Sequence, residues 1–383
     1  MNTSRQQALV LFVAGLSAIA AGTAYLGPMD GSGLWLRTVV AAGVLTAILA
    51  ILWFNLDANH PVGQPDAPFT GLGPGNTVSV LRGLVLALLA GLIPPFANGA
   101  WPQARAAAAV LVVVFMLLDL MDGWLARRTN RVSLLGERLD IETDSAGLFV
   151  VSLLGALWHL LPPWYVGMAL LRPLFVAGQA LRVRNSLTNP PWPASDSRRR
   201  AAAWQSILMV GCVWPGTDRQ LIELGAWIVA LLVAAGFGRD WLWITGTWTA
   251  DSPFNQRWQR ARYVVRSWLP VSLRPVTVLG GMTMLADPVV PLEGLPAQAL
   301  AAVAGVSLLA VLTGVGLRTG SAVLVCATGL LSIWLPFNAS MALAVGGGML
   351  LFVEGCHRYV LRVPWLKTDS PPVNPRPRRT ARR

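Results

Sequence analysis

The chain has 383 residues, of which 54% are hydrophobic and 13% are charged, and its formal net charge is +12. Soluble domains have about 25% charged residues, so this composition excludes an ordinary soluble globule. The positive charge could indicate nucleic-acid binding, but the basic residues lie in the gaps between apolar runs, as membrane topology requires. We therefore expect membrane lipids, and no nucleic acid, among the partners of this chain.

Twelve apolar runs approach the length of about 20 residues that a helix needs to cross a bilayer. Backbone groups in hydrocarbon must satisfy their own hydrogen bonds, so we expect helices. The first run could be a signal peptide, but a second follows at once, which favours an uncleaved span. The runs lie near residues 8–25, 36–54, 79–97, 103–120, 141–160, 163–180, 202–216, 221–238, 276–292, 299–316, 320–336 and 339–356. The predicted fold class is an all-α polytopic membrane protein.

Composition shifts divide this series of helices. A Gly/Pro-rich stretch at residues 59–75 is expected to link two N-terminal helices, residues 1–58, to a six-helix core at residues 76–240. A polar stretch rich in Trp and Arg, residues 241–275, is expected to be a cytoplasmic linker to a C-terminal four-helix unit at residues 276–358. The tail, residues 359–383, is rich in Pro and Arg and is expected to be disordered.

Arginines are concentrated in alternate gaps. The two gaps within the core that hold most of them contain Arg127, Arg128, Arg131 and Arg138, and then Arg182, Arg184, Arg198, Arg199 and Arg200. The excess of positive charge on cytoplasmic loops places these gaps, and both chain ends, in the cytoplasm. The Arg-rich composition, with Lys367 as the one lysine and no targeting sequence, favours a prokaryotic inner membrane.

Acidic residues gather between the fourth and fifth runs, in DLMDGWLARRTNRVSLLGERLDIETD. Asp119 and Asp122 are three residues apart, and Asp140 and Asp144 are four apart, so each pair shares one face of a helix. Two antiparallel helices would bring the four carboxylates together at the membrane surface. Carboxylates in a partly desolvated place repel each other unless a cation neutralises them. All-oxygen ligands suit Mg²⁺, Mn²⁺ or Ca²⁺.

The loop between these pairs is as basic as its ends are acidic. A metal bound by carboxylates, together with Arg127 and glycine backbone that can approach a ligand closely, is suited to binding a diphosphate. A carboxylate that does not bind metal tightly could take a proton from an attacking hydroxyl. The pattern favours metal-assisted phosphoryl or phosphodiester transfer. Two alternatives are an ordinary solvated loop and a divalent-cation transporter, although a transporter predicts carboxylates near the bilayer midplane rather than at helix ends.

The same segment resembles the CDP-alcohol phosphotransferase family. Its signature D-x2-D-G-x2-A-R-x8-G-x3-D-x3-D fits at Asp119, Asp122, Gly123, Ala126, Arg127, Gly136, Asp140 and Asp144. Upstream, GNTVSVLR at residues 75–82 is similar to the Asn-x-x-Ser/Thr-x-x-Arg segment that leads into the first core helix of this family. The resemblance covers about residues 75–240, which hold six apolar runs as the fold of the family does.

The resemblance implies transfer of a phosphoalcohol from a CDP-linked donor to an acceptor alcohol, with release of CMP. It implies that Asp119, Asp122 and Asp140 hold two divalent ions, Mg²⁺ or Mn²⁺, while Asp144 shares one ion and is the general base. The residues expected at the CDP or substrate pocket are Gly123, Ala126, Arg127, Gly136, Ser133, Asn76 and Arg82. Members are typically homodimers.

Within this family we favour a CDP-linked lipid donor and a small alcohol acceptor, which would make a phosphatidyl lipid. The alternative is a soluble CDP-alcohol donor and a lipid alcohol acceptor. The chain reads IETD after Asp140, where many members that make phosphatidyl lipids have a Pro-containing version, and this difference leaves the substrate open.

Two more arginines are candidates. Arg172 lies inside the sixth run, where an intramembrane charge is costly, and could bind an acceptor phosphate or the lipid diphosphate, or pair with a carboxylate. Arg199 could bind an acceptor phosphate or an anionic headgroup, or be an ordinary cytoplasmic arginine. In the C-terminal unit, LTGVGLRTGSAVLV is similar over a short stretch to the turn of DoxX-like four-helix membrane proteins.

Overall fold

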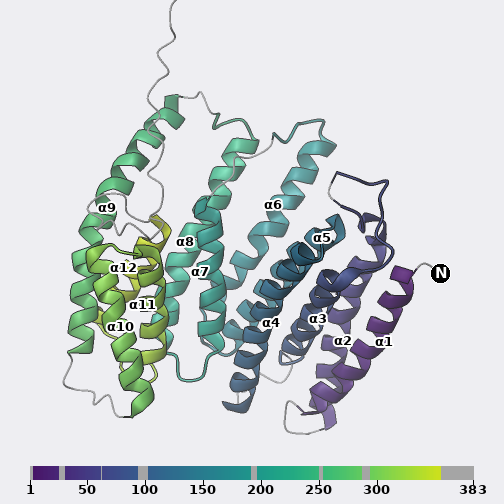
Figure 1. Cartoon of the computed structure of the whole chain (residues 1–383), viewed down its shortest axis with the longest axis horizontal. Coiled ribbons are helices and arrows are strands. Elements are labelled where there is room, and N and C mark those ends of the chain that lie inside the picture. The colour runs from purple at the N-terminus through teal and green to yellow at the C-terminus, as the bar shows by residue number, and fades with distance from the viewer. Residues whose placement is uncertain are drawn as a thin grey trace, which may run out of the picture. The chain divides into compact units, whose positions relative to one another are not determined.

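The computed structural model describes residues 3–25, 31–61, 63–93, 102–190, 196–249, 253–286 and 294–354 (Figure 1). These residues form helices and no strands, which confirms the predicted all-α class. Each of the twelve predicted apolar runs overlaps one α-helix. The predicted disordered tail, residues 359–383, lies outside the described residues.

The contacts divide the chain into two compact units, residues 1–247 and 248–383. The first unit contains α1 (Thr3–Tyr25), α2 (Gly31–Phe54), α3 (Gly73–Ala90), α4 (Pro102–Arg128), α5 (Leu134–Leu157), α6 (Val166–Arg184), α7 (Asp196–Val213) and α8 (Arg219–Ile244), with short 3₁₀ helices at η1 (Leu56–Ala58) and η3 (Pro163–Tyr165). The second unit contains α9 (Pro253–Leu285), α10 (Leu295–Thr313), α11 (Leu317–Leu331) and α12 (Ala339–Glu354).

Seven helical stretches among the described residues are long and apolar enough to cross a membrane. They are Thr3–Thr23, Gly33–Phe54, Gly73–Ala90, Ala104–Arg128, Pro163–Arg184, Arg219–Ile244 and Leu295–Thr313. The apolar stretches of α11 and α12 are shorter, and the first half of α5 carries several charged residues. These helices indicate an integral membrane protein, and the full count of twelve spans stays a prediction.

Helix α3 is central to the first unit because it packs against α1, α2, α4 and α5. Small residues allow the close approaches. A Cβ added at Gly75 would lie 2.9 Å from the Cβ of Ala126 on α4, and one added at Gly83 would lie 2.9 Å from Ile48 on α2. The buried side chains of α1 and α2, such as Ile19 and Leu45, form one core cluster with residues of α3 and α5. The two N-terminal helices therefore support the elements that carry the acidic residues.

The second unit differs from our expectation in its first element. Residues 241–275 were expected to be a linker, but α8 continues to Ile244 and α9 runs from Pro253 to Leu285 with Pro270 and Pro275 inside it. The predicted ninth run, residues 276–292, is thus the second half of a longer helix, and residues 287–293 lie outside the described part of the chain. Helix α9 packs against α10 and α12, and α11 packs against α10 and α12.

Candidate active site

Three helices bring the predicted site residues together. Asp119 and Asp122 lie in the second half of α4, Asp140 and Asp144 lie in the first half of α5, and Arg82 lies in the middle of α3. Helix α3 packs against both α4 and α5. Because the two acidic pairs have helical spacing, each presents both carboxylates to the same side of its helix.

Three of the four predicted carboxylates form a compact group. Asp119, Asp140 and Asp144 each offer an oxygen atom, and these atoms all lie within 4.8 Å of one another. Their side chains are 38%, 46% and 54% exposed, respectively. They are therefore close enough to share a cation and open enough for one to enter.

Arg82 is completely buried and its guanidinium lies among all four carboxylates. Nη1 donates to Asp119 at 2.5 Å, to Asp140 at 2.8 Å and to Asp122 at 3.3 Å, while Nη2 donates to Asp144. The guanidinium carbon also lies 4.9 Å from the ring centre of Phe115, a cation–π distance. One positive charge balances one of the four carboxylates, so a negative charge of three remains at the site, which favours the binding of cations.

Asp122 differs from the other three carboxylates. Its side chain is only 9% exposed and accepts a hydrogen bond of 2.9 Å from the Ser79 hydroxyl of α3. Asp122 is therefore held in place from two sides, by Ser79 and by Arg82. Ser79 was not among the predicted site residues, although Ser79 is the Ser of the Asn-x-x-Ser-x-x-Arg segment.

Asn76 and Ser133, which we expected at the substrate pocket, lie buried in a polar network between helices. The Asn76 amide donates to Ser133 Oγ and to Asn59 Oδ1, both at 3.2 Å. Ser133 caps the start of α5 by accepting a hydrogen bond of 3.0 Å from the Gly136 backbone NH. These contacts fix the first turn of α5, and thereby its two aspartates, relative to α3.

Gly136 permits the close approach of Asn76. A Cβ added at Gly136 would lie 2.7 Å from Asn76 Oδ1, a distance that real Cβ atoms essentially never show. We expect Gly136→Ala to destabilise the protein by about 1–3 kcal/mol, because the network must shift to avoid this clash. Thermal unfolding in detergent measures the effect. The control is Gly238→Ala in α8, where an added Cβ meets nothing within 4 Å and should stabilise the helix slightly. Equal behaviour of the two variants would contradict this role of Gly136.

The remaining signature residues lie around the end of α4. Ala126 packs against Gly75, and a Cβ at Gly123 would lie 3.1 Å from Nη1 of Arg127. Arg127 is exposed in the last turn of α4. Arg199 is exposed on α7. Neither arginine contacts the four carboxylates through a hydrogen bond in the described structure, and their predicted role in binding CDP stays a prediction.

A cavity of about 210 Å³ lies next to the carboxylates. Its lining includes Asp119, Asp144, Arg172, Gln205 and Ser206, from α4, α5, α6 and α7. Arg172, whose intramembrane position marked it as a candidate, thus faces the same cavity as two of the aspartates. Gln205 and Ser206 follow the Arg-rich start of α7, and no spacing in the sequence distinguishes them from other polar residues there.

The donor set fits a hard divalent cation. The ligand atoms are carboxylate oxygens, and no His or Cys side chain belongs to the group of Asp119, Asp140 and Asp144. Oxygen-only ligands with excess negative charge are typical of sites for Mg²⁺ or Mn²⁺ rather than zinc.

Comparison with known proteins finds that this segment is similar to one family. Residues 74–238 match the family model described as CDP-alcohol phosphatidyltransferase. The match runs from α3 to α8 and includes all four aspartates and Arg82, while α1, α2 and the second unit lie outside it. No curated protein matches the chain, and no solved structure does.

Proposed function

We propose that this protein moves a phosphatidyl group from a CDP-linked lipid donor to a small alcohol, with release of CMP, because residues 74–238 match the family model of the CDP-alcohol phosphatidyltransferases. The reaction would serve phospholipid biosynthesis at the cytoplasmic surface of a prokaryotic inner membrane. The observation that supports it most directly is the group of carboxylates around Arg82 that opens to the cavity containing Arg172.

Asp144 is best placed to accept the proton of the acceptor alcohol. Its side chain is the most exposed of the four carboxylates, and it lines the cavity. A carboxylate oxygen of Asp144 takes the hydroxyl proton while the hydroxyl oxygen forms a bond to the β-phosphorus of the donor. The bond from this phosphorus to the oxygen bridging it to CMP breaks, and CMP leaves with the electron pair.

Asp119, Asp122, Asp140 and Asp144 are the residues that would hold one or two divalent cations, Mg²⁺ or Mn²⁺. When bound, such cations supply charge neutralisation of the diphosphate and of the departing CMP. Asp122 accepts a hydrogen bond from Ser79 and is nearly buried, so its orientation is fixed. The side chains of Asp119, Asp140 and Asp144 are more exposed and are accessible to a substrate.

Arg172 supplies positive charge to the cavity. It lies on α6 and lines the same space as Asp119 and Asp144. An arginine there binds phosphate oxygens of the donor or of a phosphorylated acceptor through charge-assisted hydrogen bonds. Arg127 and Arg199 are further candidates for the donor diphosphate, and by analogy with the family the protein functions as a homodimer.

The test of the proposal is the identity of the donor. Purified full-length protein is incubated with Mg²⁺ in two reactions. The first contains small alcohols and CDP-diacylglycerol labelled in an acyl chain. The second contains CDP-choline and diacylglycerol. We expect labelled phosphatidyl product from the first reaction only. Product from the second reaction alone would support the reverse arrangement, with a soluble donor and a lipid acceptor, and would contradict the proposed direction.

A further inference from the structure

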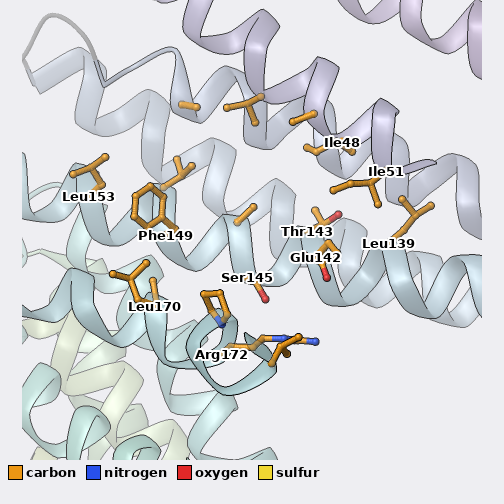
Figure 2. Close-up of a pocket in the computed structure, with 18 of the residues that line it drawn as sticks. Ile48, Ile51, Leu139, Glu142, Thr143, Ser145, Phe149, Leu153, Leu170 and Arg172 are labelled. Atoms are coloured by element: carbon orange, nitrogen blue, oxygen red, sulfur yellow. The ribbon is translucent and has the colours of Figure 1, made fainter. Parts of the chain in front are cut away.

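A second, larger cavity lies in the first unit, between α2, α5 and α6. Its volume is about 840 Å³, and its lining is mostly apolar, with Val44, Ala47 and Ile48 from α2 and Phe149, Leu153 and Leu170 from α5 and α6. Figure 2 shows Leu153, Phe149 and Leu170 toward one end of this groove, and Ile48 and Ile51 of α2 toward the other end.

The polar residues that line this groove come from α5 and α6. They are Glu142, Thr143, Ser145 and Arg172 (Figure 2). Ser145, Ala169 and Arg172 line both this groove and the active-site cavity. The two cavities therefore adjoin at these three residues, and one of the three is cationic.

The part of the groove beyond Arg172 is long enough for much of a lipid chain. From Ser145, at the junction with the active-site cavity, to Leu153, α5 rises about 12 Å. One leaflet of a bilayer has a hydrocarbon depth of about 15 Å, half of the usual 30 Å. An acyl chain that began at Arg172 could therefore remain in contact with the groove for most of the depth of one leaflet.

One wall of the groove comes from a helix outside the family-matched segment. Helix α2 ends at Phe54, and the match begins at residue 74. Its position is fixed by the shared core, since Ile48 packs against Gly83 of α3. Val40, two turns earlier on α2, also lines the groove, and Ala41 beside it packs against Gly91 at the far end of α3.

We infer that this groove binds an acyl chain of the CDP-linked lipid donor, and that the N-terminal helix α2 determines which chain lengths fit. The inference rests on the proposed function. Apolar lining favours the chain, and Arg172 at the junction favours the phosphate that follows it. The groove thus gives α2 a role in substrate selection that the catalytic segment alone does not contain.

The test fills the groove from α2. In Val40→Phe the ring occupies space that the distal part of a long chain would need, because Val40 lines the groove about two turns before Ile48, at the end of α2 away from Asp144. Val39→Phe is the matched control, because Val39 is the neighbouring residue, has the same side chain, is exposed, and does not line the groove. CMP release is measured with CDP-dioctanoylglycerol and with CDP-dioleoylglycerol in mixed micelles. We expect Val40→Phe to lower kcat/KM for the long-chain donor about tenfold relative to the short-chain donor, the loss of about two methylene contacts.

Three results would be informative in different ways. Val40→Phe with the same chain preference as Val39→Phe, while the wild type remains active, would overturn the inference without affecting the proposed function. Absence of CMP release by the wild type from either donor would count against the proposed function itself. A change in oligomeric mass of Val40→Phe by light scattering, with unchanged chain preference, would assign the groove to a second copy of the chain and also overturn the inference.

A donor with a photoreactive diazirine near the end of one acyl chain provides a readout that does not depend on turnover. After irradiation, mass spectrometry of the wild type should find adducts on peptides containing residues 40–51 of α2 and residues 169–180 of α6. Val39→Phe should label equally, and Val40→Phe should lose the α2 adducts. Labelling confined to other helices would contradict the proposed path of the chain.

Discussion

Replacing Asp144 by Asn should reduce CMP release by about a thousandfold, because the variant lacks the carboxylate that accepts the acceptor proton. The substitution keeps the size of the side chain, and Asp144 is the most exposed carboxylate of the cluster, so the fold should survive. The measurement is the steady-state rate of CMP formation at saturating donor and acceptor. The loss should appear in kcat, since proton transfer belongs to the chemical step.

The matched control is Glu137→Gln, which removes a negative charge from the exposed first turn of the same helix, α5. It should retain activity close to that of the wild type. If the loss in Asp144→Asn came only from weaker cation binding, raising the Mg²⁺ concentration would restore the rate. A rate that recovers fully with Mg²⁺, or an Asn variant that is as active as Glu137→Gln, would contradict the role of Asp144 as proton acceptor.

Replacing Arg82 by Met should destabilise the first unit by about 3–5 kcal/mol, the usual cost of removing one partner from a buried ion pair. Arg82 is completely buried and is the cation that all four aspartates share. Without it, the carboxylates repel each other across α3, α4 and α5. Urea unfolding or thermal unfolding of the detergent-solubilised protein, without divalent cations, measures the loss.

Arg138→Met is the control for a generic loss of arginine, because Arg138 is exposed and donates one hydrogen bond, to Asn55. It should change stability little. In the double variant Arg82→Met/Asp119→Asn, the two effects should be less than additive, since the second substitution removes part of the repulsion left by the first. Additive effects, or a stable Arg82→Met variant, would show that the guanidinium does not balance the cluster.

The helices and the acidic pairs could be predicted from the sequence because both depend on local spacing. Apolar runs gave the helix positions, and intervals of three and four residues placed each pair of aspartates on one side of its helix. The position of Arg82 among the aspartates could not be predicted in this way. Its partners lie 37 to 62 residues away along the chain, and their contact depends on how α3 packs against α4 and α5.

In the second unit, local sequence features favoured a linker where the structure has a helix. Residues 253–275 contain five Arg, two Trp and three Pro residues, so hydropathy favoured a linker there. The structure instead has the long helix α9, whose exposed Tyr263 and Val264 lie beside charged positions. A helix with mixed polarity has no continuous apolar run, and Pro270 and Pro275 disfavour helix on local grounds that tertiary packing against α10 and α12 overrides.

The N-terminal helices were expected as a separate pair because a Gly/Pro-rich stretch follows them. Their side chains instead share a core with α3 and α5, and Asn59, just after α2, accepts a hydrogen bond from Asn76 of α3. Composition marks where a chain leaves one helix and enters another, but it does not report which faces later meet. The close contacts of Gly22 with Leu88 and of Ile48 with Gly83 bring α1 and α2 against α3, and they appear only in three dimensions.

The most direct test of a cation-dependent transfer at the aspartate cluster is the release of CMP from CDP-diacylglycerol by the purified full-length protein. The reaction contains a mixture of small alcohols and is run in EDTA, and then with Mg²⁺ or Mn²⁺ added back. We expect no CMP in EDTA, restored release with either cation, and none from Asp144→Asn under the same conditions. CMP release that continues in EDTA, or that Asp144→Asn retains in full, would contradict the claim that the aspartate cluster performs a cation-dependent transfer.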